Sequence, residues 1–102
     1  ALDFCLCTLF DESCPTPISE HFSRTLEAQT YRVEFNRPYA GAYIAFNYCQ
    51  PRKNIYTIQL EINRSLYMNE KQLTKNSHFQ KVSADTSQAI QSLGKFLLDF
   101  KK

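Results

Sequence analysis

The fold is decided by residues 55–68, which read IYTIQLEINRSLYM. Side chains of an extended strand alternate between its two sides, so one side carries Tyr56, Ile58, Leu60 and Ile62 and the other Ile55, Thr57, Gln59, Glu61 and Asn63. β-Branched and aromatic residues dominate the stretch, which predicts a strand that ends near Asn63. The polar side is either a solvated edge or one wall of a site, because Glu61 and Asn63 are followed directly by Arg64.

Composition sets the outer limits. The chain has 102 residues, enough for a single domain with one core, and 43% hydrophobic residues exclude a disordered tail. The net charge of +2 is too small to indicate a nucleic acid or a membrane surface as partner. No apolar run approaches the roughly 20 residues that cross a bilayer, and no stretch resembles a signal peptide. Two glycines are too few for a glycine-rich phosphate loop.

The four cysteines, Cys5, Cys7, Cys14 and Cys49, contain no C-x-x-C pair, which disfavours a zinc site of the usual spacing. We interpret them as reduced, packed thiols of a cytoplasmic protein. Their even number leaves disulfides open as an alternative. The two histidines, His21 and His78, are interpreted as solvated side chains and not as metal ligands.

The remaining elements follow from local patterns. Residues 2–9 predict a strand buried on both faces. Thr16 is expected to cap a helix that has Pro17 at its first position. Residues 31–35 predict a second strand, residues 42–48 a short helix or packed segment, and residues 69–82 a loop with a helix start. Asp85 is expected to cap a final helix whose apolar stripe comprises Ala89, Ile90, Leu93, Phe96, Leu97 and Phe100.

This order of elements predicts one α/β domain over residues 1–102, with a mainly parallel sheet and flanking helices. In such sheets ligands bind beyond the carboxyl ends of the strands. Two polar clusters, residues 36–39 and 61–64, are each expected at the carboxyl end of a strand. We therefore expect the two clusters to meet at one edge of the sheet and to form a site.

Two strings resemble a known family: residues 36–44, NRPYAGAYI, and residues 59–68, QLEINRSLYM. They resemble the N-formylglutamate amidohydrolase family, as do residues 3–6 and Ser13-Cys14. The resemblance implies a zinc-carboxypeptidase-like (phosphorylase/hydrolase-like) fold and a zinc ion that activates water to hydrolyse the amide of an N-acyl amino acid. It covers only the C-terminal part of a family member, so the chain is expected to be that portion of a longer hydrolase.

The resemblance also implies where zinc would be held. The family's metal ligands belong to a Pro-His-Ser-Gly turn and an Asp-x-His strand end, and neither motif occurs in this sequence. Zinc is therefore expected in the complete protein, on ligands from an N-terminal part or a partner chain, and no metal ligand is assigned to this chain.

Carried over by position, the resemblance makes Glu61 the catalytic carboxylate, which takes a proton from water and passes it to the leaving amine. The alternative is a solvated strand residue. Arg64 is expected to clamp a substrate carboxylate, or else to form an ion pair with Glu61 or another acid. Asn36, Arg37 and Tyr39 are expected to form a substrate-facing loop, or else a solvent-facing turn.

Two other functions compete with the hydrolase. The chain is alternatively a non-catalytic remnant that binds a protein partner or oligomerises through an apolar surface. A nucleic-acid module that uses the aromatic residues is a weaker alternative, because the net charge is low and no basic stripe is present.

Overall fold

The computed structural model describes residues 2–37, 41 and 43–100, and three strands and two long helices form its framework. The elements in chain order are β1 (Phe4–Cys7), α1 (Thr16–Ala28), β2 (Val33–Phe35), α2 (Tyr43–Tyr48), the 3-10 turn η1 (Pro51–Lys53), β3 (Gln59–Ile62), the 3-10 turn η2 (Arg64–Leu66), β4 (Met68–Asn69), β5 (Thr74–Lys75) and α3 (Phe79–Asp99). The strand predicted from residues 55–68 is present as β3, with an extended approach and a turn after it.

The sheet has the order β2-β1-β3 and is mixed. β1 runs parallel to β2, with Phe4 opposite Val33, and antiparallel to β3, with Phe4 opposite Ile62. The prediction of a mainly parallel sheet is therefore wrong. A parallel β3 would need a crossover back along the sheet, and the intervening helix α2 has six residues, or roughly 9 Å of rise. The chain instead turns back at the end where β2 finishes.

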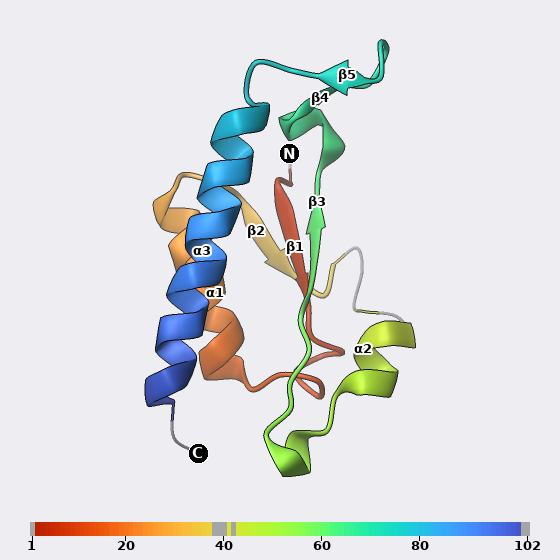
Figure 1. Ribbon diagram of the computed structural model, residues 1–102. Coiled ribbons are helices and arrows are strands. Elements are labelled where there is room, and N and C mark those ends of the chain that lie inside the picture. Colours follow the sequence, from red (N-terminus) through yellow and green to blue (C-terminus); the bar gives the residue numbers. More distant parts are fainter. Residues whose placement is uncertain (1, 38–40, 42, 101–102) are drawn as a thin grey trace.

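The two long helices pack together on one face of the sheet, and α2 lies at one end of the opposite face (Figure 1). β1 is buried at all four positions, as predicted. Its Phe4 and Leu6 side chains point toward the long helices and join a core cluster with Phe22, Leu26, Val82 and Ala89. Ile58, Leu60 and Ile62 pack against this cluster from β3 and its approach, which confirms the predicted alternation.

Both helix starts differ from the prediction. Thr16 is the first residue of α1 and not its cap, since Pro15 holds the cap position without a side-chain hydrogen bond. α3 begins at Phe79, six residues before the predicted cap Asp85. The Asp85 carboxylate instead accepts hydrogen bonds from the Tyr31 hydroxyl (2.6 Å) and from Lys81 Nζ (2.7 Å). The polar stretch before α3 forms the small β4–β5 hairpin.

Cysteine packing agrees with the interpretation as small apolar side chains. All four cysteines lie in the described residues, and none of them is in a disulfide. Cys5, Cys7 and Cys14 are buried. Among the described helices, none combines the length and the apolar character needed to cross a membrane.

Candidate functional site

The two polar clusters lie at opposite ends of the sheet. Asn36 follows β2 and contacts Thr8, just beyond the carboxyl end of β1. Asn63 follows β3 and contacts the other end of β1, where its side-chain Nδ2 donates to the Leu2 carbonyl (2.9 Å). The expectation that both clusters meet at one edge is wrong, because β3 runs antiparallel to β1. A site must therefore be sought at each end separately.

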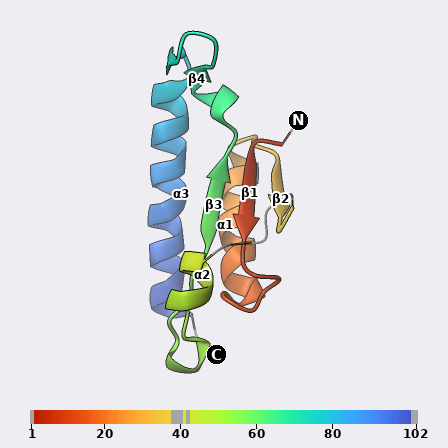
Figure 2. The same cartoon turned by 90° about the vertical axis from the view of Figure 1, so that its right-hand side faces the viewer.

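Glu61 lies in the middle of β3, opposite Cys5. Strand alternation places its side chain on the face away from α1 and α3, which we call the outer face, together with Cys5, Cys7 and Gln59. Figure 2 looks onto this face, where α2 covers only the end at which β3 begins. Glu61 is exposed and lines a cavity of about 470 Å³ whose other walls are Leu2, Asp3, Cys5, Ile62, Asn63, Arg64, Tyr67 and Glu70.

The charge of Glu61 acts on the buried Cys7 thiol of the neighbouring strand. Burial, together with smaller effects of the neighbouring Cys5 thiol and the Glu61 carboxylate, raises the pKa of Cys7 to about 12. The two sulfur atoms lie 3.7 Å apart. Cys5 lines the cavity, and Cys7 lies beside it as a neutral thiol. The Glu61 carboxylate makes no hydrogen bond or ion pair with any other described residue, so its oxygens are open to a water or a ligand.

Arg64 stands on the rim of the same cavity. Its Nε lies 4.0 Å from Glu70 Oε1, and the two side chains are 64% and 53% exposed. An ion pair this long and this exposed contributes about 0–1 kcal/mol. Its partner is Glu70 and not Glu61, so the guanidinium is only loosely held beside the carboxylate proposed for chemistry.

Asn36 has a structural role at the other end. Its amide oxygen accepts from the backbone nitrogens of Thr8 (2.8 Å) and Phe10 (3.3 Å), and its Nδ2 donates to the Thr8 hydroxyl (3.0 Å). The loop that it holds has three successive left-handed residues, Leu9, Phe10 and Asp11, with φ of 52°, 53° and 72°. Such residues are costly outside glycine and persist only where their surroundings fix them. Asn36 supplies that constraint.

Arg37 and Tyr39 are the other two residues expected in this loop. Arg37 is exposed and forms no ion pair with a described residue. Tyr39 lies outside the described residues. A substrate-facing role for this loop therefore rests on Arg37 among the residues that the structure describes, and it stays a prediction.

Within residues 2–37, 41 and 43–100, no three His, Cys, Asp or Glu side chains gather closely enough to hold an ion. His21 Nε2 is 2.9 Å from Ser92 Oγ, and its ring stacks on Phe96 between the two long helices. His78 precedes α3 and is exposed. The described residues do not fit a zinc site.

A profile described as N-formylglutamate amidohydrolase matches residues 1–68, which include both polar clusters. The chain belongs to the N-formylglutamate amidohydrolase family. No curated protein matches the sequence.

The family is also represented among similar solved structures. The crystal structure of N-formylglutamate amidohydrolase from Ralstonia eutropha JMP134 superposes with a TM-score of 0.82 at 27% sequence identity. The match covers 91% of this chain and 32% of that chain. The present residues therefore span about a third of the length of this amidohydrolase, and the α/β fold is shared.

Sequence reasoning did not find two of the residues that shape these ends. Thr8 is fully buried and connects Asn36 to the loop after β1. Asp3 lines the Glu61 cavity while its carboxylate accepts from the Arg32 backbone nitrogen (2.7 Å). Thr8 directly follows the buried apolar run, and Asn36 directly follows the next predicted strand. These two positions at the ends of neighbouring strands were the only sequence signal for their contact. The placement of Asp3 depends on the β1–β3 register, which no local pattern encodes.

Proposed function

We propose that this chain is part of an amidohydrolase that cleaves the amide bond of an N-acyl amino acid such as N-formylglutamate. One observation carries the proposal: the family match over residues 1–68 includes Glu61 and every other candidate residue. The solved structure with the same fold is itself named an N-formylglutamate amidohydrolase. The position of Glu61 in a cavity of about 470 Å³ is compatible with a small substrate.

Amide hydrolysis needs a group that removes a proton from water and delivers one to the leaving nitrogen. In this proposal Glu61 does both. Its ionised carboxylate accepts the proton as the water oxygen bonds to the acyl carbon. The same proton then passes to the amine nitrogen as the carbon–nitrogen bond breaks, which returns Glu61 to its ionised form. Zinc ligands, which the family resemblance places on other motifs, would have to come from polypeptide outside these residues.

The substrate of such an enzyme carries a carboxylate, and two arginines are candidates to bind that carboxylate. Arg64 lines the same cavity as Glu61, whereas Arg37 lies toward the opposite end of the sheet. A small N-acyl amino acid bound at Glu61 therefore meets Arg64 first. We assign the carboxylate to Arg64, whose planar guanidinium can donate two parallel hydrogen bonds.

The test is hydrolysis of N-formyl-L-glutamate by the complete gene product that contains these residues, with Glu61→Gln as the variant. The substitution keeps the shape and removes the base, so kcat/KM is expected to fall by about 10²- to 10⁴-fold. Glu34→Gln is the matched control, because Glu34 is the partner of Cys5 on the opposite neighbouring strand. An unchanged rate in Glu61→Gln would remove this residue from the mechanism.

A second function is a non-catalytic module that binds a protein partner. The observation that favours it is an apolar cavity of about 910 Å³ on the helix side of the sheet, away from Glu61. The same assay separates the two: a complete gene product that shows no turnover of N-formyl amino acids, and whose Glu61→Gln variant is identical to it, supports the binding module.

A further inference from the structure

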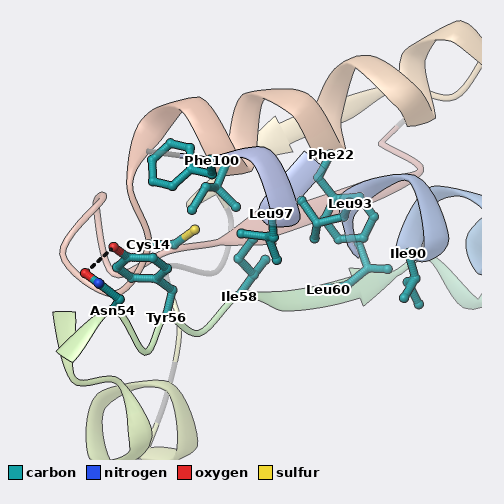
Figure 3. Close-up of a pocket in the computed structure, with 11 residues that line it drawn as sticks. Cys14, Phe22, Asn54, Tyr56, Ile58, Leu60, Ile90, Leu93, Leu97 and Phe100 are labelled. Atoms are coloured by element: carbon teal, nitrogen blue, oxygen red, sulfur yellow. Dashed lines mark hydrogen bonds between the residues drawn. The ribbon is translucent and has the colours of Figure 1, made fainter. Parts of the chain in front are cut away.

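An apolar groove runs between α3 and the segment that leads into β3. Figure 3 shows side chains from both elements pointing into it. The groove has a volume of about 910 Å³ and is lined by Cys14, Ile18, Phe22, Asn54, Tyr56, Ile58, Leu60, Ile90, Leu93, Leu97 and Phe100. A second hollow of about 260 Å³ continues along the same seam past Ile62, Val82 and Thr86. α3 and β3 thus leave a hollow seam along much of their length.

Two α3 side chains on this seam are exposed although they are large and apolar. Ile90 is 54% exposed and Leu97 is 41% exposed. Burial of such side chains is favourable, so a further segment that covered Ile90 and Leu97 would stabilise the protein. Gly94 lies between them, and an added Cβ there would meet no atom within 4 Å. This part of α3 therefore has room for a close neighbour.

The floor of the groove is also the free edge of the sheet. β3 pairs with β1 on one side and, within the described residues, with no strand on the other. The Asn63 backbone nitrogen donates to the Asp3 carbonyl (2.9 Å), so Asn63 and every second residue before it point their backbone N–H and C=O groups toward β1. Leu60 and Ile62 then belong to the pairs whose backbone N–H and C=O groups point away from β1. The edge offers hydrogen bonds to a strand, and the groove above it offers apolar contact.

From this juxtaposition we propose that an extended strand adds to the free edge of β3, with its alternate apolar side chains in the groove beneath α3. The occupant is polypeptide equivalent to the part of the N-formylglutamate amidohydrolase chain that the present residues do not span. The inference rests on the proposed function in one respect, since it names the polypeptide that would complete the enzyme. It is the edge-addition mode by which extended segments join exposed sheets.

The comparison with the solved amidohydrolase favours this occupant over a second copy of the chain. The match covers 91% of the present residues, so it leaves out only about nine of them and includes most of the 21 residues of α3. In that protein the matched part is only 32% of the chain. If the solved amidohydrolase has a groove with the same walls, about two thirds of its own chain is available to fill that groove.

The test is amide hydrogen exchange at Leu60 and Ile62, measured in the isolated 102-residue chain and in the complete gene product. These two amides are expected to exchange freely in the isolated chain and at least about a hundredfold more slowly in the complete product. Ile90→Lys is expected to lower the Tm of the complete product by roughly 5 °C or more and to leave the isolated chain almost unchanged. Leu98→Lys is the matched control, because Leu98 is 86% exposed on the same helix and does not line the groove.

Each other result overturns the proposal. Equal exchange at both amides in the two samples means that nothing covers the edge. Protection in the isolated chain that rises with protein concentration, together with a dimeric mass in light scattering, identifies a second copy as the occupant. The exchange measurement does not depend on turnover: a protected edge in a protein without hydrolase activity would refute the proposed function alone.

Discussion

The amide oxygen of Asn36 lies 2.8 Å from the backbone nitrogen of Thr8, and through this contact one side chain fixes the loop that follows β1. Thr8 is fully buried, so its N–H has no access to water as a substitute acceptor. The same amide also contacts Phe10 and the Thr8 hydroxyl. The loop conformation therefore depends on a residue 28 positions away in sequence.

Asn36→Gly is expected to lower the free energy of unfolding by about 1–3 kcal/mol. Asn36 itself has φ of 55°, which glycine adopts freely, so this substitution isolates the loss of the amide. Urea denaturation of the isolated chain measures the effect. Arg37→Ala is the control, since that exposed side chain forms no ion pair with a described residue, and equal stability of the two variants would contradict the structural role of Asn36.

The two glycines are expected to respond to alanine in opposite directions. Gly41 has φ of 129°, and a Cβ there would lie 2.8 Å from Leu9 Cδ2, so Gly41→Ala should destabilise the protein by about 1–3 kcal/mol. Gly94 lies inside α3 with open space around it, so Gly94→Ala should stabilise the isolated chain by about 0.5–1 kcal/mol. Thermal or urea unfolding of both variants checks the signs. A loss of stability in Gly94→Ala would mean that this side of α3 is already covered.

Stability is expected to fall at alkaline pH because of the buried thiols. Burial raises the pKa of Cys7 and of Cys14 from 9.0 to about 12. Between these values the thiols of the unfolded state lose their protons while those of the folded state keep them. A rise in pH therefore stabilises the unfolded state relative to the folded state. The contribution of these thiols to the free energy of unfolding should be complete well below pH 9 and be lost as the pH rises through 9 toward 12.

Cys14→Ala tests this assignment, because the variant should show a shallower decline in guanidinium unfolding between about pH 8 and pH 11. Cys49→Ala is the control, as Cys49 is only half-buried. Tyr31 and Lys81, whose pKa values are also raised, add to the slope in all three proteins. Parallel curves for the wild type and Cys14→Ala would show that this thiol does not contribute.

The hydrogen bond between Tyr31 and Asp85 is expected to couple the segment after α1 to α3. Its length is 2.6 Å, and a double-mutant cycle with Tyr31→Phe and Asp85→Ala should give a coupling of about 0.5–1.5 kcal/mol. The Arg24–Glu20 pair serves for comparison: it is exposed, and Arg24→Ala should cost less than about 0.5 kcal/mol. A coupling near zero would mean that the contact is incidental.

The same contact predicts acid sensitivity. The hydrogen bonds from Lys81 and Tyr31 lower the pKa of Asp85 below 3.8. The folded state therefore binds this proton less readily than the unfolded state, and the stabilisation is present above that value and lost as the pH falls through the lowered pKa. Asp85→Asn should remove this component of acid unfolding, which is measurable by circular dichroism between about pH 5 and pH 2.

Local patterns were sufficient for much of the fold. The buried run before Thr8 and the alternation from Ile58 to Ile62 each reflect one element facing one core, and both are present in the structure. The predicted stripe of α3 faces the core only in part: Ala89 and Leu93 join it, whereas Ile90 and Leu97 are exposed. The direction of β3 relative to β1 could not be predicted from local patterns. It depends on whether the segment between β2 and β3 spans the sheet, and the shortness of α2 decided against it.

The arrangement of the candidate site was predictable only in part. Glu61 and Arg64 line one cavity, in agreement with their proximity in sequence. Asn36 was expected beside them because both strands were taken to point the same way. Asp85 illustrates a related limit. The local sequence around it fits a helix cap equally well as a carboxylate inside the helix that bonds a distant tyrosine, and only the position of Tyr31 distinguishes the two.

The pairing of β1 with β3 has a consequence for biosynthesis. β1 can associate with β2 once residue 35 has left the ribosome, but Phe4 must wait for Ile62 before its other edge is closed. Long-range closures of this kind are slow compared with local ones. A nascent polypeptide thus carries an unprotected, entirely apolar strand from the synthesis of β1 until residue 62 has emerged, and that interval is when a chaperone would have the greatest effect on the yield of this protein.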